Sequence, residues 1–427
     1  MKRILCLIAL IAALAASAGD PQIASVTLTQ DETTRMVTVT YDLLGANAIV
    51  TVEFLTNGAP VAAADCARVS GDVNKMVSAG TGKTIRWTPT AFASRPAPEL
   101  ANAVACVKAW TTTNPPPYMV QDMLEPFGRF YYEAAENIPG GVQDRQYKTT
   151  KMVFRRIPAA GVTFKMGSPS GEAERKSNED YHEVTLLYDF WLGIYPVTQG
   201  QYMTILKTPK TTWLQDTYGS VCPGSFSNEV DAALYPVDHL STRMLRNEYG
   251  SLGGSYYNRT MEQGFLWHFS YMCGFYEGTL PGALKNADAT HKADLPSEAE
   301  WEFACRAGSG DPRNADGTAD EIAWHSGNSG GKFHPVGMKK PNAWGLYDML
   351  GGVWEICRDG YADNLGTAAV ENPFTGNGYG GRNVKRGGSI WEDASYSRNA
   401  ARSLINTRDY PMNGNRGDGF RIMIPLW

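Results

Sequence analysis

Several features that would define a metal-binding or nucleic-acid-binding protein are missing from this sequence. It contains no Cys-x-x-Cys pair, which argues against a structural zinc site. It also has no basic excess, because 39 Lys and Arg residues face 44 Asp and Glu residues, giving a formal net charge of −5. We therefore expect no nucleic-acid partner, since phosphate binding needs clustered positive charge. With 43% hydrophobic and 19% charged residues, the chain is neither disordered nor fibrous.

Long apolar runs are absent beyond the N-terminus, so we expect no membrane span. The N-terminus itself begins with the charged residues Lys2 and Arg3, continues with an apolar run over 4–15 and ends in small residues at 16–18. This order is typical of a secretory signal peptide over residues 1–18, cleaved near Ala18. The sequence thus predicts a secreted or periplasmic protein.

An oxidising compartment would permit disulfides among the cysteines that follow the leader. These are Cys66, Cys106, Cys222, Cys273, Cys305 and Cys357. Cys66 and Cys106 fall in one N-terminal segment, and we expect them to pair. Cys222 can pair with Cys273, but three pairings of the last four cysteines remain open.

The N-terminal part of the chain alternates β-branched and polar residues with a period of two. The clearest segments are 23–29, 36–41, 48–54, 83–89 and 103–110, with a turn at Asn57-Gly58. Short strands at steady spacing predict an all-β sandwich over residues 19–113, of immunoglobulin or fibronectin type. It would act as a spacer or adhesive module, or simply as a scaffold. Three consecutive prolines then start a connecting segment at 114–150.

Three helices are expected in the remainder, which is otherwise rich in Gly turns. Residues 297–307 have Ser297 and Glu300 in capping-box positions and Gly308 after the last turn. A second helix is expected over 198–206, with Gln199 and Gln201 on its outer face. A third is expected over 241–249.

Several motifs after residue 150 occur in an order that resembles the sulfatase-modifying-factor family, whose archetype is the formylglycine-generating enzyme. They include Phe-Lys-Met-Gly-Ser-Pro at 164–169, Leu-Pro-Ser-Glu-Ala-Glu-Trp-Glu-Phe at 295–303, Asn-Ala-Trp-Gly-Leu-Tyr-Asp-Met at 342–349, Arg-Gly-Gly-Ser at 386–389 and Gly-Phe-Arg at 419–421. The resemblance covers about 151–427. It implies an irregular α+β domain with the formylglycine-generating-enzyme fold, related to C-type lectins.

The resemblance also implies structural calcium, which would support a fold with little regular structure. The positions that match the family's site are the side chain of Asp348 and the carbonyls of Met349, Gly351 and Val353. The family usually has Asn at the first position, and either side chain supplies the oxygen that a hard cation prefers. The alternative is that Asp348 caps a turn. A second calcium site would start at Asn328 and Ser329, where the shorter loop leaves the other ligands open.

The family archetype oxidises a cysteine of a sulfatase to formylglycine, using O₂ and a copper ion held by two cysteines after Arg-Gly-Gly-Ser. If the segment is aligned from Arg-Gly-Gly-Ser, the two copper positions fall on Glu392 and Ser397. If it is aligned from its C-terminal end, the second position falls on Ala394. No thiol is present in either alignment, and Cu(I) prefers soft thiolates. We therefore expect no copper and no copper-dependent cysteine oxidation.

A polar and aromatic set remains around the matching position and predicts a binding pocket: Ser389, Trp391, Glu392, Asp393, Tyr396, Arg398 and Asn399. Such a groove suits an extracellular peptide, protein or carbohydrate. Acid/base chemistry by Glu392 and Asp393 is an alternative, and a solvated loop around a core Trp is a simpler one. The tight glycine pair at 387–388 is expected to set backbone geometry, and Arg386, Arg402 and Arg421 to make structural ion pairs or carbonyl contacts.

The sequence also leaves two other functions open. A relative in the superfamily uses non-heme iron with histidine ligands. None of the 6 histidines here has the spacing of a helical metal pair, although a triad of distant residues would still permit an active protein-modifying oxidoreductase. The position of the segment between 389 and 419 also fits a hypervariable lectin-like display protein. The evidence for that function would lie in the DNA.

Overall fold

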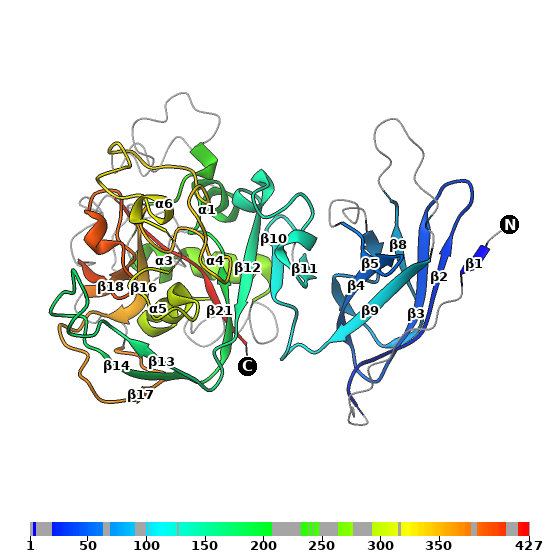
Figure 1. The fold of residues 1–427 in the computed structure, drawn as a ribbon, viewed down its shortest axis with the longest axis horizontal. Helices are drawn as coiled ribbons and strands as arrows, with labels where there is room; N and C mark the ends of the chain where they lie inside the picture. The colour runs from blue at the N-terminus through cyan, green and yellow to red at the C-terminus, as the bar shows by residue number, and fades with distance from the viewer. Residues whose placement is uncertain are drawn as a thin grey trace, which may run out of the picture. The chain divides into compact units, whose positions relative to one another are not determined.

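The computed structural model describes residues 3–5, 19–62, 69–89, 100, 102–125, 128–206, 232–238, 240, 242–246, 264–275, 293–314, 317–376, 382–406 and 417–426. The contacts divide the chain into two compact units (Figure 1). The first contains Met1–Val120 and Arg129–Asp144, and the second contains Gln121–Gly128 and Arg145–Trp427. Each unit is described by itself.

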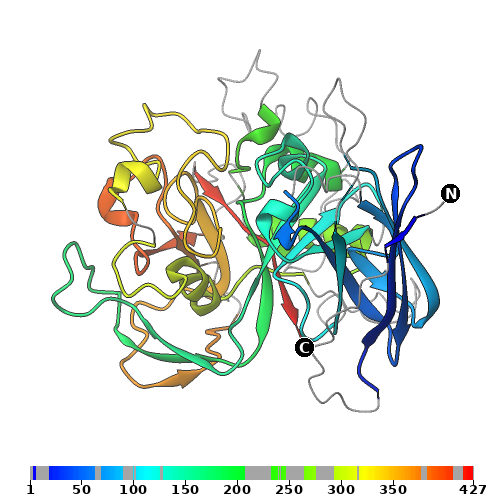
Figure 2. The same cartoon turned by 45° about the vertical axis from the view of Figure 1, so that its right-hand side comes forward.

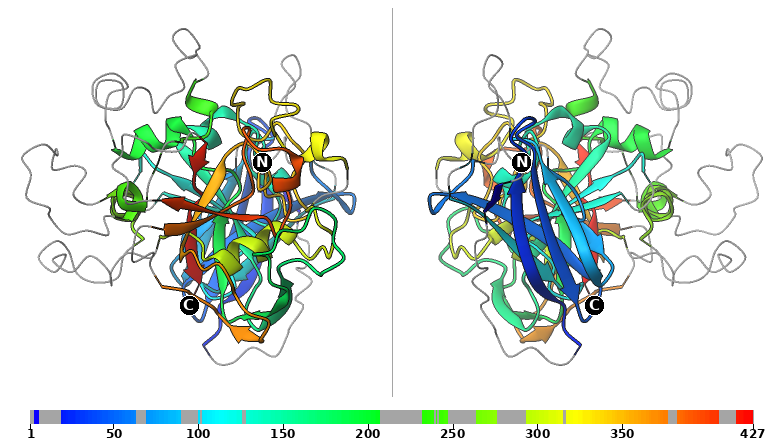
Figure 3. Two further views of the ribbon diagram at one scale, coloured as in Figure 1. Left: turned by 90° about the vertical axis from the view of Figure 1, so that its left-hand side faces the viewer. Right: turned by 90° about the vertical axis from the view of Figure 1, so that its right-hand side faces the viewer.

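The first unit contains two antiparallel sheets. One has the strand order β1-β2-β3-β8-β6, formed by Arg3–Leu5, Gln22–Gln30, Val37–Leu44, Gly80–Trp87 and Val69–Gly71. Its long strands run side by side in the right-hand view of Figure 3. In the other sheet β4 (Ala48–Thr56) pairs with β9 (Ala103–Trp110), β5 (Ala59–Pro60) and β7 (Lys75–Val77).

Side chains from both sheets form one hydrophobic core. Every second residue of β3 is buried, which is the two-residue period expected from the sequence. Phe54 of β4 stacks on Trp87 of β8 with ring centroids 4.3 Å apart, so the two sheets share their interior. Asn57 and Gly58 both have positive φ, as a tight hairpin between β4 and β5 requires. The predicted strands of this segment are confirmed.

Some expectations for the N-terminal part lie outside the described residues. Cys66 is among these, as are residues 6–18 of the expected leader. Cys106, its expected partner, is described and is a free cysteine, so the structure does not form the predicted Cys66–Cys106 disulfide. The expected connecting segment contains β10 (Tyr118–Asp122), β11 (Arg129–Tyr132) and two short 3₁₀ helices, Ala135–Asn137 and Arg145–Lys148. Its residues are divided between the two units.

Among the described residues, the strands of the second unit fall into three sheets. The first contains β12 (Lys151–Ile157), β15 (Asp189–Gly193) and β21 (Met423–Leu426) in that spatial order. The second contains β13 (Val162–Met166), β14 (His182–Leu186) and β17 (Val370–Glu371); β17 runs parallel to β14 despite its distance in sequence (Figure 2). The third has the order β19-β18-β16-β20, from Arg402–Asn406, Arg382–Arg386, Trp354–Gly360 and Asp418–Gly419.

Helix α5 (Glu298–Arg306) confirms the capping prediction. The Ser297 hydroxyl accepts the N–H of Glu300, and the Glu300 carboxylate accepts the N–H of Ser297. The left-handed residue that ends the helix is Ala307, one position before the expected Gly308. All nine residues of α5 are buried, and the helix packs against β13, β16 and β18.

Helix α1 (Gln199–Leu206) lies where expected, but the prediction for its outer face is wrong. Gln199 and Gln201 are both buried. The Gln201 amide donates to the carbonyls of Tyr147 and Lys151, at 3.0 and 2.9 Å, and these acceptors explain why a polar side chain is tolerated inside. Of the third expected helix, the structure describes α3 (Thr242–Arg246).

Two further helices were not foreseen, α4 (Gly264–Cys273) and α6 (Ala319–Ile322). Phe265 of α4 stacks on Tyr202 of α1 and meets Phe420 edge-on, with ring centroids 5.0 and 5.2 Å away. Helix α4 therefore packs directly behind the Gly-Phe-Arg motif. Within the described part of the chain, no helix is long and apolar enough to cross a membrane.

Cys305 and Cys357 are buried free thiols, so a disulfide between these two is excluded. The Cys305 thiol donates to the Asn399 side-chain oxygen at 3.3 Å. Burial raises the pKa of both thiols, which keeps them protonated. Cys222, the expected partner of Cys273, lies outside the described residues.

Candidate functional site

The sheet β19-β18-β16-β20 brings three distant motifs together. Glu355 of β16 pairs with Arg386 of β18, which opens the Arg-Gly-Gly-Ser motif. On the other side, Trp354 and Glu355 pair in parallel with Asp418 and Gly419, where Gly-Phe-Arg begins. The loop that follows β18 therefore starts from a rigid three-strand base.

Gly387 and Gly388 set the path of that loop, as expected. Gly387 has φ +96°, and a Cβ there would lie 2.6 Å from the Met349 carbonyl oxygen. Its own carbonyl accepts the N–H of Gly351 at 2.8 Å. Only glycine combines this conformation with so close a backbone approach. Residues 387–388 thus attach the loop to the segment that follows Asp348.

The first part of the loop is held in place but partly open to solvent. The Ser389 hydroxyl donates to Glu392 Oε2 at 2.6 Å and accepts the N–H of Trp391 at 3.2 Å. Trp391 is 43% exposed and meets Phe333 edge-on, with ring centroids 6.1 Å apart. Ser389, Trp391 and Glu392 are therefore brought together as the sequence predicts, at the position that matches the family's first copper ligand.

Asp393 and Tyr396 continue this surface through a short 3₁₀ helix, Ala394–Tyr396. Asp393 accepts the N–H of Ser395 at 2.8 Å, and hydrogen bonds from Ser395 are the main cause of its lowered pKa. The Asp393 carboxylate therefore caps the 3₁₀ helix, whereas the Glu392 carboxylate accepts the Ser389 hydroxyl. Tyr396 meets Trp354 edge-on, and Lys176 lies over its ring at 4.8 Å. Lys176 comes from a loop far upstream, and no sequence pattern indicates that it lies here.

The last two predicted pocket positions, Arg398 and Asn399, do not line an open surface, which corrects that part of the pocket prediction. Arg398 is fully buried and makes two hydrogen bonds to the Glu179 carboxylate, at 2.6 and 3.0 Å. Asn399 is buried and donates to the Asp311 carbonyl at 2.8 Å. Ser397, counted as a copper position, is buried too, and its hydroxyl has no hydrogen-bond partner among the described residues.

Buried arginines hold the loop after β18 in place. Arg386, Arg402 and Arg421 make the ion pairs and carbonyl contacts expected from the sequence. Arg386 donates to the carbonyls of Ala400 and Ala401 and pairs with Glu302. Arg402 makes two 2.7 Å bonds to Glu298 of α5. These contacts fix both ends of the 387–401 segment to the same helix.

The donor chemistry at Asp348 fits a calcium ion. Asp348 has φ +52°, and its Oδ2 accepts the N–H of Gly337 at 2.5 Å, which leaves Oδ1 for a cation. Burial raises its pKa to about 6, while Arg421 and Lys148 lower it. A bound cation would replace the solvation that the buried carboxylate has lost. Together with the carbonyls of Met349, Gly351 and Val353, this oxygen would hold the ion.

The second expected calcium position fits poorly. The Asn328 amide oxygen accepts the N–H of His325 at 2.9 Å, and its amide nitrogen donates to Ala323 and Asp320. The Ser329 hydroxyl donates to the Ile390 carbonyl at 3.3 Å. Both side chains are therefore hydrogen-bonded within the protein, and this position does not fit a second calcium ion.

The residues at the copper positions do not fit copper, because a carboxylate and a buried hydroxyl stand where the family has thiolates. Nowhere in the described ranges do three or more His, Cys, Asp and Glu side chains gather to hold a metal. His325 bonds to Asp320, and His334 to the Ser329 carbonyl.

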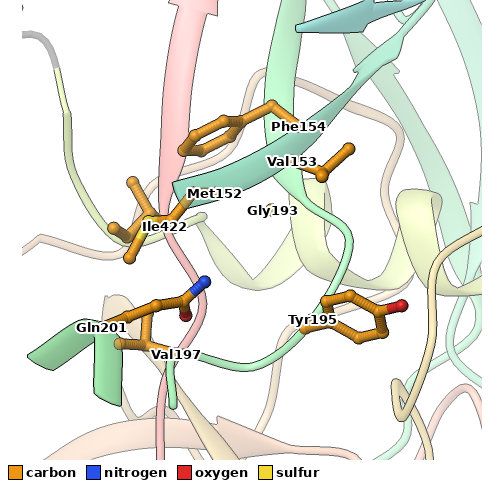
Figure 4. A pocket seen from close by; sticks show the side chains of 8 residues that line it. All are labelled: Met152, Val153, Phe154, Gly193, Tyr195, Val197, Gln201 and Ile422. Carbon is orange, nitrogen blue, oxygen red and sulfur yellow. The ribbon is translucent and has the colours of Figure 1, made fainter. Parts of the chain in front are cut away.

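A small crevice lies elsewhere in the unit, between the ends of β12 and β15 and helix α1 (Figure 4). It is lined by Met152, Val153, Phe154, Gly193, Tyr195, Val197, Gln201 and Ile422. The side chains of Gln201 and Ile422 lie on one side and Tyr195 on the other. The crevice is mostly apolar, and the Gln201 amide in its lining is already hydrogen-bonded to the carbonyls of Tyr147 and Lys151. It is therefore a packing feature of the core and contains none of the predicted site residues.

Comparison with known proteins agrees with this arrangement of motifs. Residues 142–425 match the sulfatase-modifying factor enzyme 1-like domain, and the chain belongs to that family. A formylglycine-generating enzyme from Streptomyces coelicolor is 37% identical over 146 residues, which cover 29% of this chain and 44% of the relative. The serine/threonine-protein kinase pkn1 of Chlamydia pneumoniae is 27% identical over 300 residues, covering 70% of this chain and 41% of the relative.

The chain thus spans less than half the length of either curated relative. Among solved structures, Treponema denticola variable protein 1 aligns with a TM-score of 0.45 and 25% identity, covering 64% of this chain and 95% of that one. PvdO from Pseudomonas aeruginosa aligns with a TM-score of 0.45 and 24% identity, covering 64% of this chain and 94% of that one.

Proposed function

We propose that this chain is an exported binding protein that retains the family scaffold and has no copper-dependent cysteine oxidase activity. The observation that carries the proposal is the loop after β18. Its glycines, its arginine anchors and its connection to α5 are in place, but Glu392 and the buried Ser397 occupy the copper-ligand positions. A peptide or a carbohydrate would bind to the exposed part of this loop.

The remaining thiols support the same proposal. Cys305 and Cys357 are completely buried in the core behind the loop, and their raised pKa values disfavour the thiolate that binds Cu(I). Neither therefore substitutes for the missing pair.

Three finer parts of the proposal come from the sequence. Cleavage near Ala18 would export the protein. The N-terminal unit, with limits near 19–113, would be a spacer of immunoglobulin or fibronectin type. The second unit, near 151–427, would be a relative of C-type lectins stabilised by one calcium ion at Asp348.

The test combines metal analysis with a reaction assay. The purified full chain is analysed for calcium, copper and iron, and is then incubated with a peptide containing Cys-x-Pro-x-Arg, O₂ and added copper. A copper-loaded family member with both cysteines serves as the positive control. We expect calcium without stoichiometric copper or iron, and no mass loss on the peptide cysteine. Conversion of that cysteine to formylglycine would contradict the proposal.

A further inference from the structure

We propose that Trp391 and Glu392 form a binding site for a neutral carbohydrate, with the indole ring as a stacking surface and the carboxylate as an acceptor for hydroxyl groups. This inference rests on the binding function proposed above and assigns it a ligand class. It also places the ligand on the side of the loop that is open to solvent.

The indole ring is exposed but firmly held. Ile390, the preceding residue, is buried in a small cluster with Phe333 and Val353. The Phe333 ring also packs edge-to-face with the Trp391 ring. On another side lies Gly417, where a Cβ would come within 3.0 Å of the indole Cδ1 and 3.1 Å of Ser389 Oγ. These contacts fix the ring before a ligand arrives, so little conformational entropy is lost when its free surface is covered.

The Glu392 carboxylate is held by the same Ser389 hydroxyl that accepts the backbone N–H of Trp391. Ser389 Oγ donates to Oε2 at 2.6 Å, and the Glu392 carbonyl accepts the N–H of Ser326 at 2.9 Å. The ionised carboxylate accepts hydrogen bonds through both oxygens, and Ser389 uses only part of this capacity. A flat apolar surface with an adjacent oriented acceptor matches a sugar ring, whose C–H face stacks on an aromatic ring while its hydroxyls donate.

The surrounding charges favour a neutral ligand over a cationic peptide. The Asp393 carboxylate already caps the Ala394–Tyr396 helix through Ser395. Lys176 donates to Ser395 Oγ at 3.3 Å and lies over Tyr396, so it places a positive charge beside Asp393. Because Lys176 offsets the charge of Asp393, this part of the loop attracts a basic segment less strongly than two uncompensated acids would.

The experiment measures binding of the labelled full chain to an array of neutral hexose and N-acetylhexosamine oligosaccharides, alongside immobilised peptides rich in Lys and Arg. The strongest oligosaccharide is then titrated by calorimetry. We expect Trp391→Ala and Glu392→Gln each to weaken it at least tenfold, and Ser389→Ala to weaken it less. Phe374→Ala is the matched control, because Phe374 is a similarly exposed aromatic at 46% in the same unit.

Each variant is checked by circular dichroism and thermal melting, so that a loss of fold is not read as a loss of binding. Failure of all oligosaccharides to bind, or binding that survives Trp391→Ala, would overturn the inference. Trp391-dependent binding of basic peptides alone would also overturn it, while leaving the proposed binding function intact. Formylglycine formation in the assay above would instead contradict the proposed function itself.

Discussion

The Arg421 guanidinium holds the Glu355 carboxylate through two hydrogen bonds, from Nε to Oε2 at 3.0 Å and from Nη2 to Oε1 at 2.7 Å. Both residues are fully buried. Arg421 also donates to the carbonyls of Gly193 and Tyr347, so one side chain joins the Gly-Phe-Arg motif to β15, β16 and the segment before Asp348. The described strands of this unit are short, and the Arg421 hydrogen bonds connect β15 and β16, which belong to different sheets.

Replacing Arg421 with Ala should destabilise the second unit by about 3–5 kcal/mol, because Glu355 would be left as an unpaired buried charge. Chemical denaturation followed by tryptophan fluorescence measures the change. Arg382→Ala is the control, since Arg382 faces the exposed Asp363 at 3.9 Å and should cost less than about 1 kcal/mol. If the two substitutions lowered the free energy of unfolding equally, the buried Arg421–Glu355 pair would contribute no more to stability than an exposed pair.

Replacing Gly387 with Ala should destabilise the protein more than replacing Gly352. Both glycines have positive φ, at +96° and +73°, so both substitutions incur a conformational cost. Only at Gly387 would the new methyl group meet backbone, 2.6 Å from the Met349 carbonyl oxygen, whereas at Gly352 nothing lies within 4 Å. The difference in unfolding free energy should be about 1–3 kcal/mol. A difference near zero would mean that the loop after β18 shifts freely.

Local signals explain which elements could be predicted. The α5 boundaries follow from Ser297, Glu300 and the residues after the last turn, all of which act within a few positions. The prediction for α1 is correct in position and wrong in orientation, because Gln201 is satisfied by carbonyls from another segment. Helical periodicity does not reveal such acceptors.

The candidate site shows the same limit. Ser389, Trp391 and Glu392 are neighbours in sequence, so their grouping could be anticipated. Arg398 belongs to the same stretch, but its partner Glu179 comes from the loop before β14, and this distant carboxylate draws the side chain inside. Lys176 comes from that same loop. Only the folded structure brings these residues to the site.

Raising the pH should destabilise the second unit through Asp359. Burial and the nearby Glu298 charge raise the pKa of this carboxyl from 3.8 to about 7. The folded state therefore binds its proton more tightly than the unfolded state, and stability from this group is present at low pH and declines between about 4 and 7. Asp359→Asn should flatten that decline by up to about 1.4 kcal/mol per pH unit. Denaturation at several pH values provides the measurement, and parallel pH profiles for the two proteins would contradict the assignment.

Removing calcium should lower the melting temperature of the second unit. A ligand bound only to the folded state stabilises it by mass action, by about 2.7 kcal/mol at a hundredfold excess over Kd. Melting curves with calcium and with EDTA measure the shift. Asp348→Ala should abolish it, and Asp348→Asn should retain it, because the amide still offers an oxygen. An unchanged melt of the wild-type protein in EDTA would refute the Asp348 site.

The thiols of Cys305 and Cys357 should resist alkylation in the folded protein. Both are completely buried, and burial raises their pKa values, so neither presents the reactive thiolate. Treatment with iodoacetamide at pH 8, followed by peptide mass spectrometry, should leave them unmodified under native conditions and modify both in urea without a reductant. Modification in the native state would place a thiol within reach of solvent and copper. A requirement for reductant in urea would reveal a disulfide instead.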